Sequence, residues 1–342
     1  MDRLAQSETK ARGELFERTG DRVDIHPGLV EKDFWVCWTL KHLFSIPEFE
    51  SRLLFKGGTT LSKIFGVIRR FSEDIDMAVD YVALGFTGDR DPLTPMSNTK
   101  RTKLLDEMLM VCRDYIASDF LSSLRSRMAE ILPPDADWDL YVDPEDGHIV
   151  NFRYPAAAEK VDYVRPEVRL ELGTHAEFIP NDHYTVKPYA AEQYPEAFNH
   201  PDCTVRAIKI ERTFWEKLTI LHQERFRTSE RGEPSRFSRH YYDTYMMMQH
   251  SADCRAALQS PDLLHRVVEH KKRFYPRRWA RYDLAVPATL QLMPSDDWLD
   301  YLRRDYETMQ VMMFGESPSF DEILDGLQSL EDEIHRMPSA AD

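Results

Sequence analysis

The stretch that decides the fold lies between residues 53 and 80 and reads LLFKGGTTLSKIFGVIRRFSEDIDMAVD. The apolar run at residues 52–55 predicts a short strand that leads into the glycine pair Gly57-Gly58. Helix-forming residues with apolar spacing then predict a helix over residues 59–68. Residues 75–80 alternate between apolar and acidic side chains, which predicts a second strand. The sequence therefore predicts a strand, a glycine turn, a helix and a strand in direct succession.

The segments outside this unit are mostly helical in pattern. Helical periodicity is predicted over residues 30–44, 99–132, 205 onward and 318–337, whereas residues 82–98 read as a loop. Short β-like segments occur over residues 138–172, and the clearest is the strict alternation at 168–172. The fold class predicted is α/β (α+β), with a small mixed sheet. We expect N-terminal helices at 1–50, the core at 51–200 and a helical C-terminal domain at 201–342.

Composition limits the classes of partner. The 342 residues include 44 basic and 59 acidic ones, for a net charge of −15, which excludes a protein that coats nucleic acid with its whole surface but allows a local basic patch. The four cysteines have neither zinc-site spacing nor a disulfide pattern, so we expect a cytoplasmic protein. No apolar run is long enough to span a bilayer, so no membrane partner is expected.

The central unit carries residues suited to binding a metal and a triphosphate. The turn at Gly57-Gly58-Thr59 lets the backbone approach a ligand and presents N–H groups at a helix start. Asp74 and Asp76 are two positions apart on the predicted strand, so both carboxylates project from one face. Two like charges so close favour a cation between them, and Mg²⁺ prefers oxygen ligands. We therefore expect Asp74 and Asp76 to bind catalytic Mg²⁺.

The segments 55–63 and 70–76 resemble the AbiEii/AbiGii family of nucleotidyltransferase toxins, in the DNA polymerase β-like nucleotidyltransferase superfamily. The segments 211–222, 239–245 and 270–282 resemble later motifs of that family, so matching stretches run from about residue 30 to 325. Thr59 stands where serine is more usual, and the spacer of residues 60–73 is slightly longer than in the superfamily at large. The resemblance implies a polymerase β-like core and an NTP substrate.

The resemblance also implies further site residues. A third carboxylate is expected on a later strand; Glu171 fits between Leu170 and Leu172, and Glu167 on the same face is the alternative. Lys217 would neutralise charge on the nucleotide phosphates. Asp243 lies among aromatic residues and needs a partner if it is buried, which Lys217 or Arg239 would supply. The resemblance places Asp243 in the active site, and a purely structural ion pair is the alternative.

Three polar side chains near the turn are further candidates for nucleotide binding. Lys56 and Lys63 flank the glycine pair, and Ser72 precedes the aspartates by two positions, where its hydroxyl would hold a phosphate oxygen. Together with Gly57, Gly58 and Thr59, they complete the expected nucleotide-binding set. A second Mg²⁺ is expected beside the first, because stabilising a leaving pyrophosphate requires charge on its side of the bond.

A basic segment interrupts the otherwise acidic C-terminal half. Aromatic residues interleave with six cations, which are Lys271, Lys272, Arg273, Arg277, Arg278 and Arg281. Cations attract phosphates and aromatic rings stack on bases, so this segment predicts contact with an RNA acceptor. The alternative is that these cations pair with the acidic helix predicted near residues 319–335.

These observations predict a Mg²⁺-dependent nucleotidyltransferase that transfers NMP from an NTP to an acceptor hydroxyl. The family resemblance implies the toxin of a bacterial toxin–antitoxin pair, with a cognate antitoxin, phage defence as a possible setting, and the 3′ end of tRNA as the favoured acceptor. One alternative is a transferase that modifies a protein or a small molecule. The other is a non-catalytic module that keeps the nucleotide pocket, against which the intact Asp74 and Asp76 argue.

Overall fold

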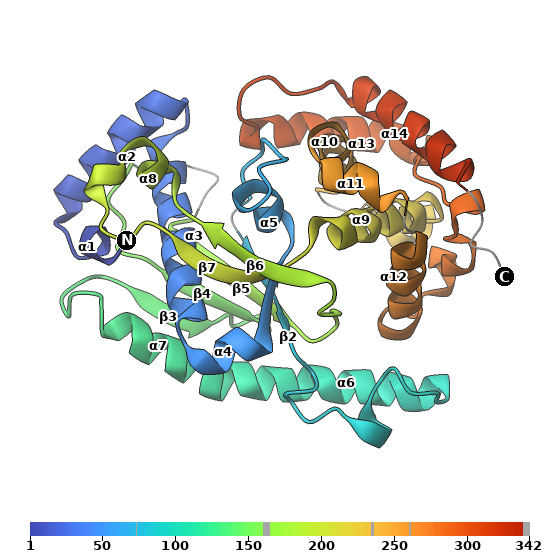
Figure 1. Cartoon of the computed structure of the whole chain (residues 1–342), viewed down its shortest axis with the longest axis horizontal. Helices are drawn as coiled ribbons and strands as arrows, with labels where there is room; N and C mark the ends of the chain where they lie inside the picture. The colour runs from blue at the N-terminus through green and yellow to red at the C-terminus, as the bar shows by residue number, and fades with distance from the viewer. Residues whose placement is uncertain (73, 160–164, 234–235, 260, 338–342) are drawn as a thin grey trace. The chain divides into compact units, whose positions relative to one another are not determined.

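A computed structural model describes residues 1–72, 74–159, 165–233, 236–259 and 261–337 (Figure 1). Glu73, part of the motif at 70–76, lies outside the described residues. The chain forms two compact units, one of residues 1–64 and 71–208, and the other of residues 65–70 and 209–342. No helix in the described part of the chain is both long and apolar enough to cross a bilayer.

The first unit is built on a seven-stranded mixed sheet, in the order β3-β4-β5-β2-β1-β7-β6. Its strands are β1 (Leu53–Lys56), β2 (Asp74–Val79), β3 (Asp139–Val142), β4 (Ile149–Arg153), β5 (Glu167–Gly173), β6 (Asn181–Val186) and β7 (Cys203–Ile208). β2 runs antiparallel to β1 and parallel to β5, so the two strands of the central unit occupy the middle of the sheet. The predicted α/β class with a mixed sheet is confirmed.

The helices of the first unit are α1 (Asp2–Ala5), α2 (Thr9–Val23), α3 (Pro27–Phe44), α4 (Pro47–Arg52), α5 (Gly58–Lys63), α6 (Asn98–Tyr115), α7 (Leu121–Ala129) and α8 (Tyr189–Gln193). α3 packs on the sheet against β5 and β7 (Figure 1). Its Trp35 and Trp38 contact the ring of Phe152 on β4, with ring centroids 5.9 and 5.7 Å away. Ile75 and Met77 of β2 are fully buried in the same core. The apolar face of β2 is thereby fixed under the helices.

A buried ion pair holds α5 against α3. The Lys63 ammonium lies 2.6 Å from the Asp33 carboxylate, and both side chains are at most 5% exposed. The same ammonium lies 3.7 Å from the centre of the Tyr189 ring. The backbone N–H of Tyr189 donates a hydrogen bond to the Asp33 carboxylate. This buried ion pair therefore fixes the C-terminal end of α5, the helix that follows the glycine turn.

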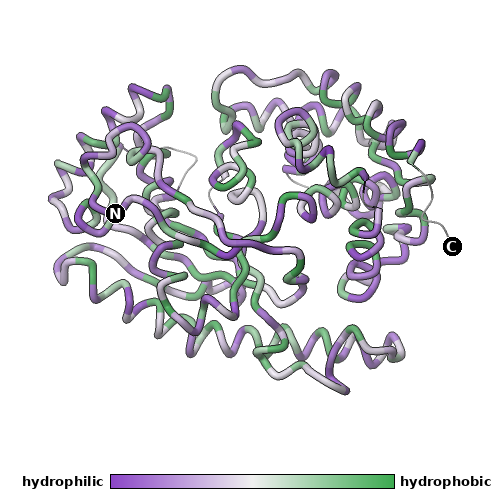
Figure 2. The backbone as a smooth tube through the Cα atoms, in the orientation of Figure 1, coloured by the Kyte–Doolittle hydropathy of each residue, from purple (hydrophilic) through white to green (hydrophobic). Residues whose placement is uncertain are grey.

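The second unit is helical. Its helices are α9 (Ile210–Arg225), α10 (Ser238–His250), α11 (Ala252–Ala257), α12 (Pro261–Phe274), α13 (Asp296–Met309) and α14 (Phe320–His335). α14 begins with a capping box between Ser319 and Glu322, and hydrophobic and hydrophilic residues alternate along it (Figure 2). The predicted acidic helix at 318–337 is therefore confirmed with slightly shorter bounds.

Three elements predicted from sequence differ in extent from those of the structure. The helix predicted at 59–68 ends at Lys63, and Arg69 and Arg70 pair with the backbone at 313–314 within the second unit. The helix predicted at 99–132 contains a π-helical turn at Ile116–Phe120 and ends at Ala129. The helical pattern expected from residue 205 begins instead with β7, which pairs in parallel with β1.

Candidate active site

The glycine turn and the aspartates meet directly in the first unit. The register of β1 and β2 places Lys56 opposite Asp76. Gly57 follows with a φ of +86°, and a Cβ added to it would lie 1.8 Å from Oδ2 of Asp76. Only a residue without a side chain fits between this backbone and this carboxylate. The chain therefore brings the start of α5 against the second aspartate.

We expect Gly57→Ala to impair the site severely. The new methyl group would displace the Asp76 carboxylate, and a shift of about 1 Å costs on the order of 100-fold in rate. The backbone conformation adds about 1–3 kcal/mol of strain. The rate of nucleotidyl transfer and the free energy of unfolding measure these effects. Gly173→Ala is the matched control, because nothing lies within 4 Å of a Cβ added there. Equal activity in both variants would contradict the close approach.

Hydroxyl groups tie the turn to the start of β2. The Thr59 hydroxyl donates to the carbonyl oxygen of Asp74 at 2.6 Å and lies 3.1 Å from the Ser72 hydroxyl. The Thr60 hydroxyl donates to the Gly57 carbonyl oxygen at 2.7 Å. Thr59 is fully buried, so its side chain stabilises the turn. A ligand would therefore be bound by the backbone of Thr59 and not by its hydroxyl. Ser72 lies just before β2, which begins at Asp74.

The carboxylates form a row across two neighbouring strands. Asp74 and Asp76 are half-buried and share the face of β2 opposite to the buried Ile75 and Met77. The parallel register of β2 and β5 places Glu171 directly beside Asp76. Backbone partners in a sheet have side chains on the same face, about 5 Å apart. Asp74, Asp76 and Glu171 are therefore neighbours on one surface of the sheet.

The two glutamates that the sequence left as alternatives have different neighbours. Glu171 pairs in register with Asp76, and its carboxylate accepts a hydrogen bond from the Arg169 Nε at 2.9 Å. Glu167 instead pairs in register with Arg153 on β4, and the Tyr141 hydroxyl donates to its carboxylate at 3.0 Å. Proximity to the aspartates therefore favours Glu171.

The structure separates the two candidate lysines of the turn. Lys56 is half-buried and lies in register with Asp76, on the face that carries the carboxylates. Lys63 is instead committed to Asp33, and this pair raises the pKa of its ammonium, although burial alone would lower it. The expectation that Lys63 contacts phosphate is corrected, because its ammonium is buried between α3 and α8.

A buried charge cluster lies in the second unit. Asp243 on α10 accepts hydrogen bonds from Nζ of Lys217 at 2.7 Å and from Nε and Nη2 of Arg70 at 2.7 and 2.9 Å. The predicted pairing of Asp243 with Lys217 is confirmed. The sequence missed the second partner: Arg70, rather than Arg239, completes the cluster, and the apolar neighbours Ile68 and Phe71 were the signal that this arginine is buried.

Burial and neighbouring charges shift the pKa values of this cluster in opposite directions. Burial alone would raise the pKa of the Asp243 carboxyl, but Arg70 and Lys217 hold it well below its usual range. Burial lowers the pKa of the Lys217 ammonium, and Asp243 offsets only part of that effect. Two cations share one carboxylate, so the cluster carries a net positive charge when all three groups are ionised. An anion such as phosphate complements a site of this kind.

The basic segment is partly exposed. Arg277, Arg278 and Arg281 are exposed, and Arg281 pairs with Asp283. Lys272 pairs with Glu269 on the same helix, and Arg273 is half-buried. The ion pairs found for this segment are thus local ones. Two arginines that the sequence did not indicate, Arg227 and Arg231, lie over the ring of Trp279 at 5.4 and 4.8 Å from its centre.

Lys271 does not fit the expected RNA-binding set. Its side chain is directed inward, the residue is 8% exposed, and its ammonium donates to the carbonyl oxygen of Glu216 at 3.2 Å. Burial lowers the pKa of Lys271 to about 7, and the charge of Glu216 offsets only part of this effect. The expectation that Lys271 contacts RNA is therefore corrected.

Lys271 is expected to make stability depend on pH. Between its folded pKa of about 7 and its ordinary value of 10.5, the unfolded chain binds the proton more strongly than the folded chain. Stability therefore rises with pH in this window, by up to about 1.4 kcal/mol per pH unit. Urea unfolding between pH 7 and 9 measures this slope. Lys271→Met should flatten it and Lys272→Met should not; an unchanged slope in Lys271→Met would contradict the assignment.

The donor set fits a hard divalent cation in chemistry. Asp74, Asp76 and Glu171 offer only carboxylate oxygens, which Mg²⁺ prefers, and Gly57 leaves the space around Asp76 free of a side chain. Within the described ranges, no three His, Cys, Asp or Glu side chains converge as a ready-made metal site. In this structure the Glu171 carboxylate is paired with Arg169 at 2.9 Å.

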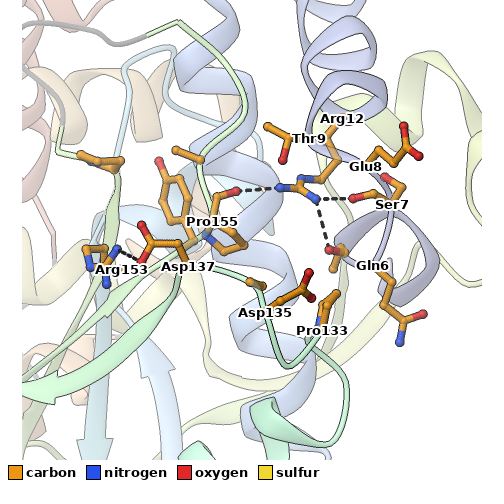
Figure 3. Close-up of a pocket in the computed structure, with 15 residues that line it drawn as sticks. Gln6, Ser7, Glu8, Thr9, Arg12, Pro133, Asp135, Asp137, Arg153 and Pro155 are labelled. Atoms are coloured by element: carbon orange, nitrogen blue, oxygen red, sulfur yellow. Dashed lines mark hydrogen bonds and ion pairs between the residues drawn. The ribbon is translucent and has the colours of Figure 1, made fainter.

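A large cavity in the described part of the first unit lies elsewhere. It has a volume of about 710 Å³ and is lined by the start of α2 and by the loops after α7 and β4 (Figure 3). Arg12 is 4% exposed there and donates to the carbonyl oxygens of Ser7 and Pro155 (Figure 3). Among the described residues, its lining includes none from the glycine turn, β2 or β5. Arg12 thus joins the N-terminal segment to the loop that follows β4.

Comparison with known proteins gives a family match. A family model described as "Nucleotidyl transferase AbiEii toxin, Type IV TA system" matches residues 38–326. Among solved structures, the chain is similar to MenT4, a nucleotidyltransferase toxin from Mycobacterium tuberculosis H37Rv, with 15% identity and a TM-score of 0.42 over 89% of this chain and 94% of that one. No match was found among curated proteins. The family match includes the glycine turn, the aspartate pair, Lys217 and Asp243.

Proposed function

Because the chain belongs to the AbiEii family of nucleotidyl transferase toxins of type IV toxin–antitoxin systems, we propose that it transfers NMP from an NTP to an RNA acceptor. Family membership makes the chain a nucleotidyltransferase toxin of a type IV toxin–antitoxin system, and it implies an NTP substrate and an antitoxin partner. The acceptor, the metal and the roles of single residues are the proposal. The observation that carries it is the close approach of Gly57 to the Asp76 carboxylate.

Asp74, Asp76 and Glu171 would hold the metal in this proposal. Bound Mg²⁺, as one ion or two, supplies Lewis acidity for the acceptor hydroxyl and for the leaving pyrophosphate. Asp74 and Asp76 stand on a central strand whose other face is buried, so these two carboxylates hold their positions without reorganising. Backbone N–H groups of the turn would bind the triphosphate, and Lys56, in register with Asp76, would neutralise part of its charge.

Lys217 and Asp243 keep their proposed roles in catalysis. Asp243 would orient Lys217, and the positive charge of their cluster would be compensated by phosphate oxygens. Arg70 would hold Asp243 in place through its two hydrogen bonds. The alternative, a purely structural ion pair, is supported by the burial of all three side chains.

The proposed acceptor is RNA, with the 3′ end of tRNA favoured by the family resemblance. Lys272, Arg273, Arg277, Arg278 and Arg281 would contact its backbone, because an acidic protein needs a local cation-rich surface to bind RNA. The cytoplasm is the proposed location and phage defence the proposed setting. Trp279, flanked by Arg227 and Arg231, offers an aromatic surface beside these cations.

The RNA assignment predicts a salt-sensitive defect. Arg278→Glu is expected to weaken tRNA binding and to reduce the slope of log affinity against log salt by about 1. Binding is measured by filter retention between 50 and 200 mM salt, the range over which phosphate contacts weaken most visibly. Arg255→Glu is the matched control, since it reverses one exposed charge on α11. Equal slopes in the two variants would exclude Arg278 as a phosphate contact.

A labelling experiment tests the proposed reaction. The protein is incubated with Mg²⁺, each α-labelled NTP in turn, and total RNA, total protein or a mixture of small hydroxyl compounds. Label in RNA that ribonuclease removes supports the proposal, and chelation of the metal should abolish it. Label in protein or in small molecules supports the alternative acceptors. No label anywhere, together with expression as harmless as that of Asp76→Ala, would indicate a non-catalytic module.

A further inference from the structure

Arg169 stands on the carboxylate face beside both aspartate positions. The register of β2 and β5 places it directly opposite Asp74, with Glu171 two residues further along opposite Asp76. Val168 and Leu170 are fully buried on the other face, so Arg169 and Glu171 must share the polar one. On the far side, Arg169 pairs in register with Asn151 of β4. Backbone pairing in three strands therefore fixes where this arginine lies.

The guanidinium of Arg169 holds the third carboxylate. Its Nε donates to Oε1 of Glu171 at 2.9 Å. The side chain of Arg169 is 40% exposed and that of Glu171 is 42% exposed. The register of β2 and β5 places the same arginine beside Asp74. Arg169 therefore contacts one of the three carboxylates and neighbours a second.

This pairing competes with a metal for Oε1 of Glu171 and for the negative charge of its carboxylate. Three carboxylates in adjacent register positions repel one another, and Arg169 and Lys56 are the cations in those same positions. A divalent ion that binds Glu171 through Oε1 has to displace the Arg169 guanidinium from that oxygen. The displaced guanidinium then needs another anion, and a nucleotide phosphate offers the fork-like geometry that arginine prefers.

The geometry points to Arg169 as a latch that couples metal binding to nucleotide binding: it holds Glu171 until a nucleotide phosphate replaces that carboxylate as its partner. This inference rests on the proposed function of the same site. Metal alone is bound weakly, because the latch opposes it. Metal and nucleotide together are bound strongly, because the phosphate releases Glu171. Arg169 is thus a positioning residue for Glu171 in the metal-free protein.

Binding of Mn²⁺, followed by electron paramagnetic resonance, tests the latch without turnover. The affinity is measured with and without an α,β-methylene NTP, which cannot be cleaved, in the full-length protein. In Arg169→Gln, we expect the Mn²⁺ affinity without nucleotide to rise about tenfold. The factor by which nucleotide increases the Mn²⁺ affinity should fall about tenfold, which is within the usual range of coupling between sites. Arg169→Lys, which keeps the charge without the fork, should fall between the two.

Two further variants separate the possible failures. Arg153→Gln removes a charge from the same sheet at the position opposite Glu167, so it controls for simple electrostatics. If it changes the nucleotide-dependent gain as much as Arg169→Gln does, or if Arg169→Gln leaves that gain unchanged, the latch is overturned. Asp74→Ala should remove Mn²⁺ binding altogether. Wild-type protein that binds no Mn²⁺ under any condition would overturn the proposed metal site, and the latch with it.

Discussion

Asp74→Asn and Asp76→Asn should each lower the rate of nucleotidyl transfer by about 10³-fold or more, equal to about 4 kcal/mol of activation free energy. Asparagine keeps the shape of the side chain but removes the negative charge that a divalent cation requires. Both aspartates are half-buried on a strand whose other face is held in the core by Ile75 and Met77. The loss should therefore be one of chemistry, with the fold retained.

The measurement is incorporation of labelled nucleotide under single-turnover conditions, beside a thermal unfolding curve for each variant. Asp139→Asn is the matched control, because Asp139 is an aspartate at the edge of the same sheet, on β3, and pairs with Arg125 at 2.9 Å. It should transfer nucleotide at the wild-type rate. An active, folded Asp76→Asn variant would remove the reason to place the reaction at this strand.

The centre of the sheet was predictable from sequence because its signals are local. A glycine pair between an apolar run and an alternating acidic run limits the chain to very few local structures. β1 and β2 accordingly lie within one residue of the strands predicted at 52–55 and 75–80. The position of Asp74 and Asp76 on one face follows from the two-residue period of a strand alone. No knowledge of the tertiary fold was needed for this part of the site.

The remaining features depend on contacts between distant parts of the chain. Sequence could not separate Glu171 from Glu167, because both have the same alternation and only the strand register distinguishes them. Arg70 and Asp243 are 173 residues apart, so neither position indicates the other. β6 was not predicted, because the burial along it shows no regular alternation that a sequence pattern would reflect. Edge strands of this kind are specified by their neighbour rather than by their own period.

Removal of the Asp243 carboxylate should have the largest effect on stability. Asp243→Ala leaves Arg70 and Lys217 buried side by side without their anion, and breaking a buried pair in this way costs about 3–5 kcal/mol. The depressed pKa of Asp243 gives the sign of the pH dependence: its contribution is fully present above the ordinary aspartate pKa and is lost as the pH falls below it. Urea unfolding at pH 7 measures the difference from wild type.

A charge-free replacement of the whole cluster separates stability from catalysis. Substituting Arg70 and Lys217 by methionine and Asp243 by leucine removes all three charges together, and such changes are often neutral or stabilising. If the cluster were purely structural, this triple variant would be stable and would still transfer nucleotide. If Lys217 carries phosphate charge, the variant should be as stable as wild type yet inactive. A small loss of stability in Asp243→Ala, below about 1 kcal/mol, would contradict the buried pairing itself.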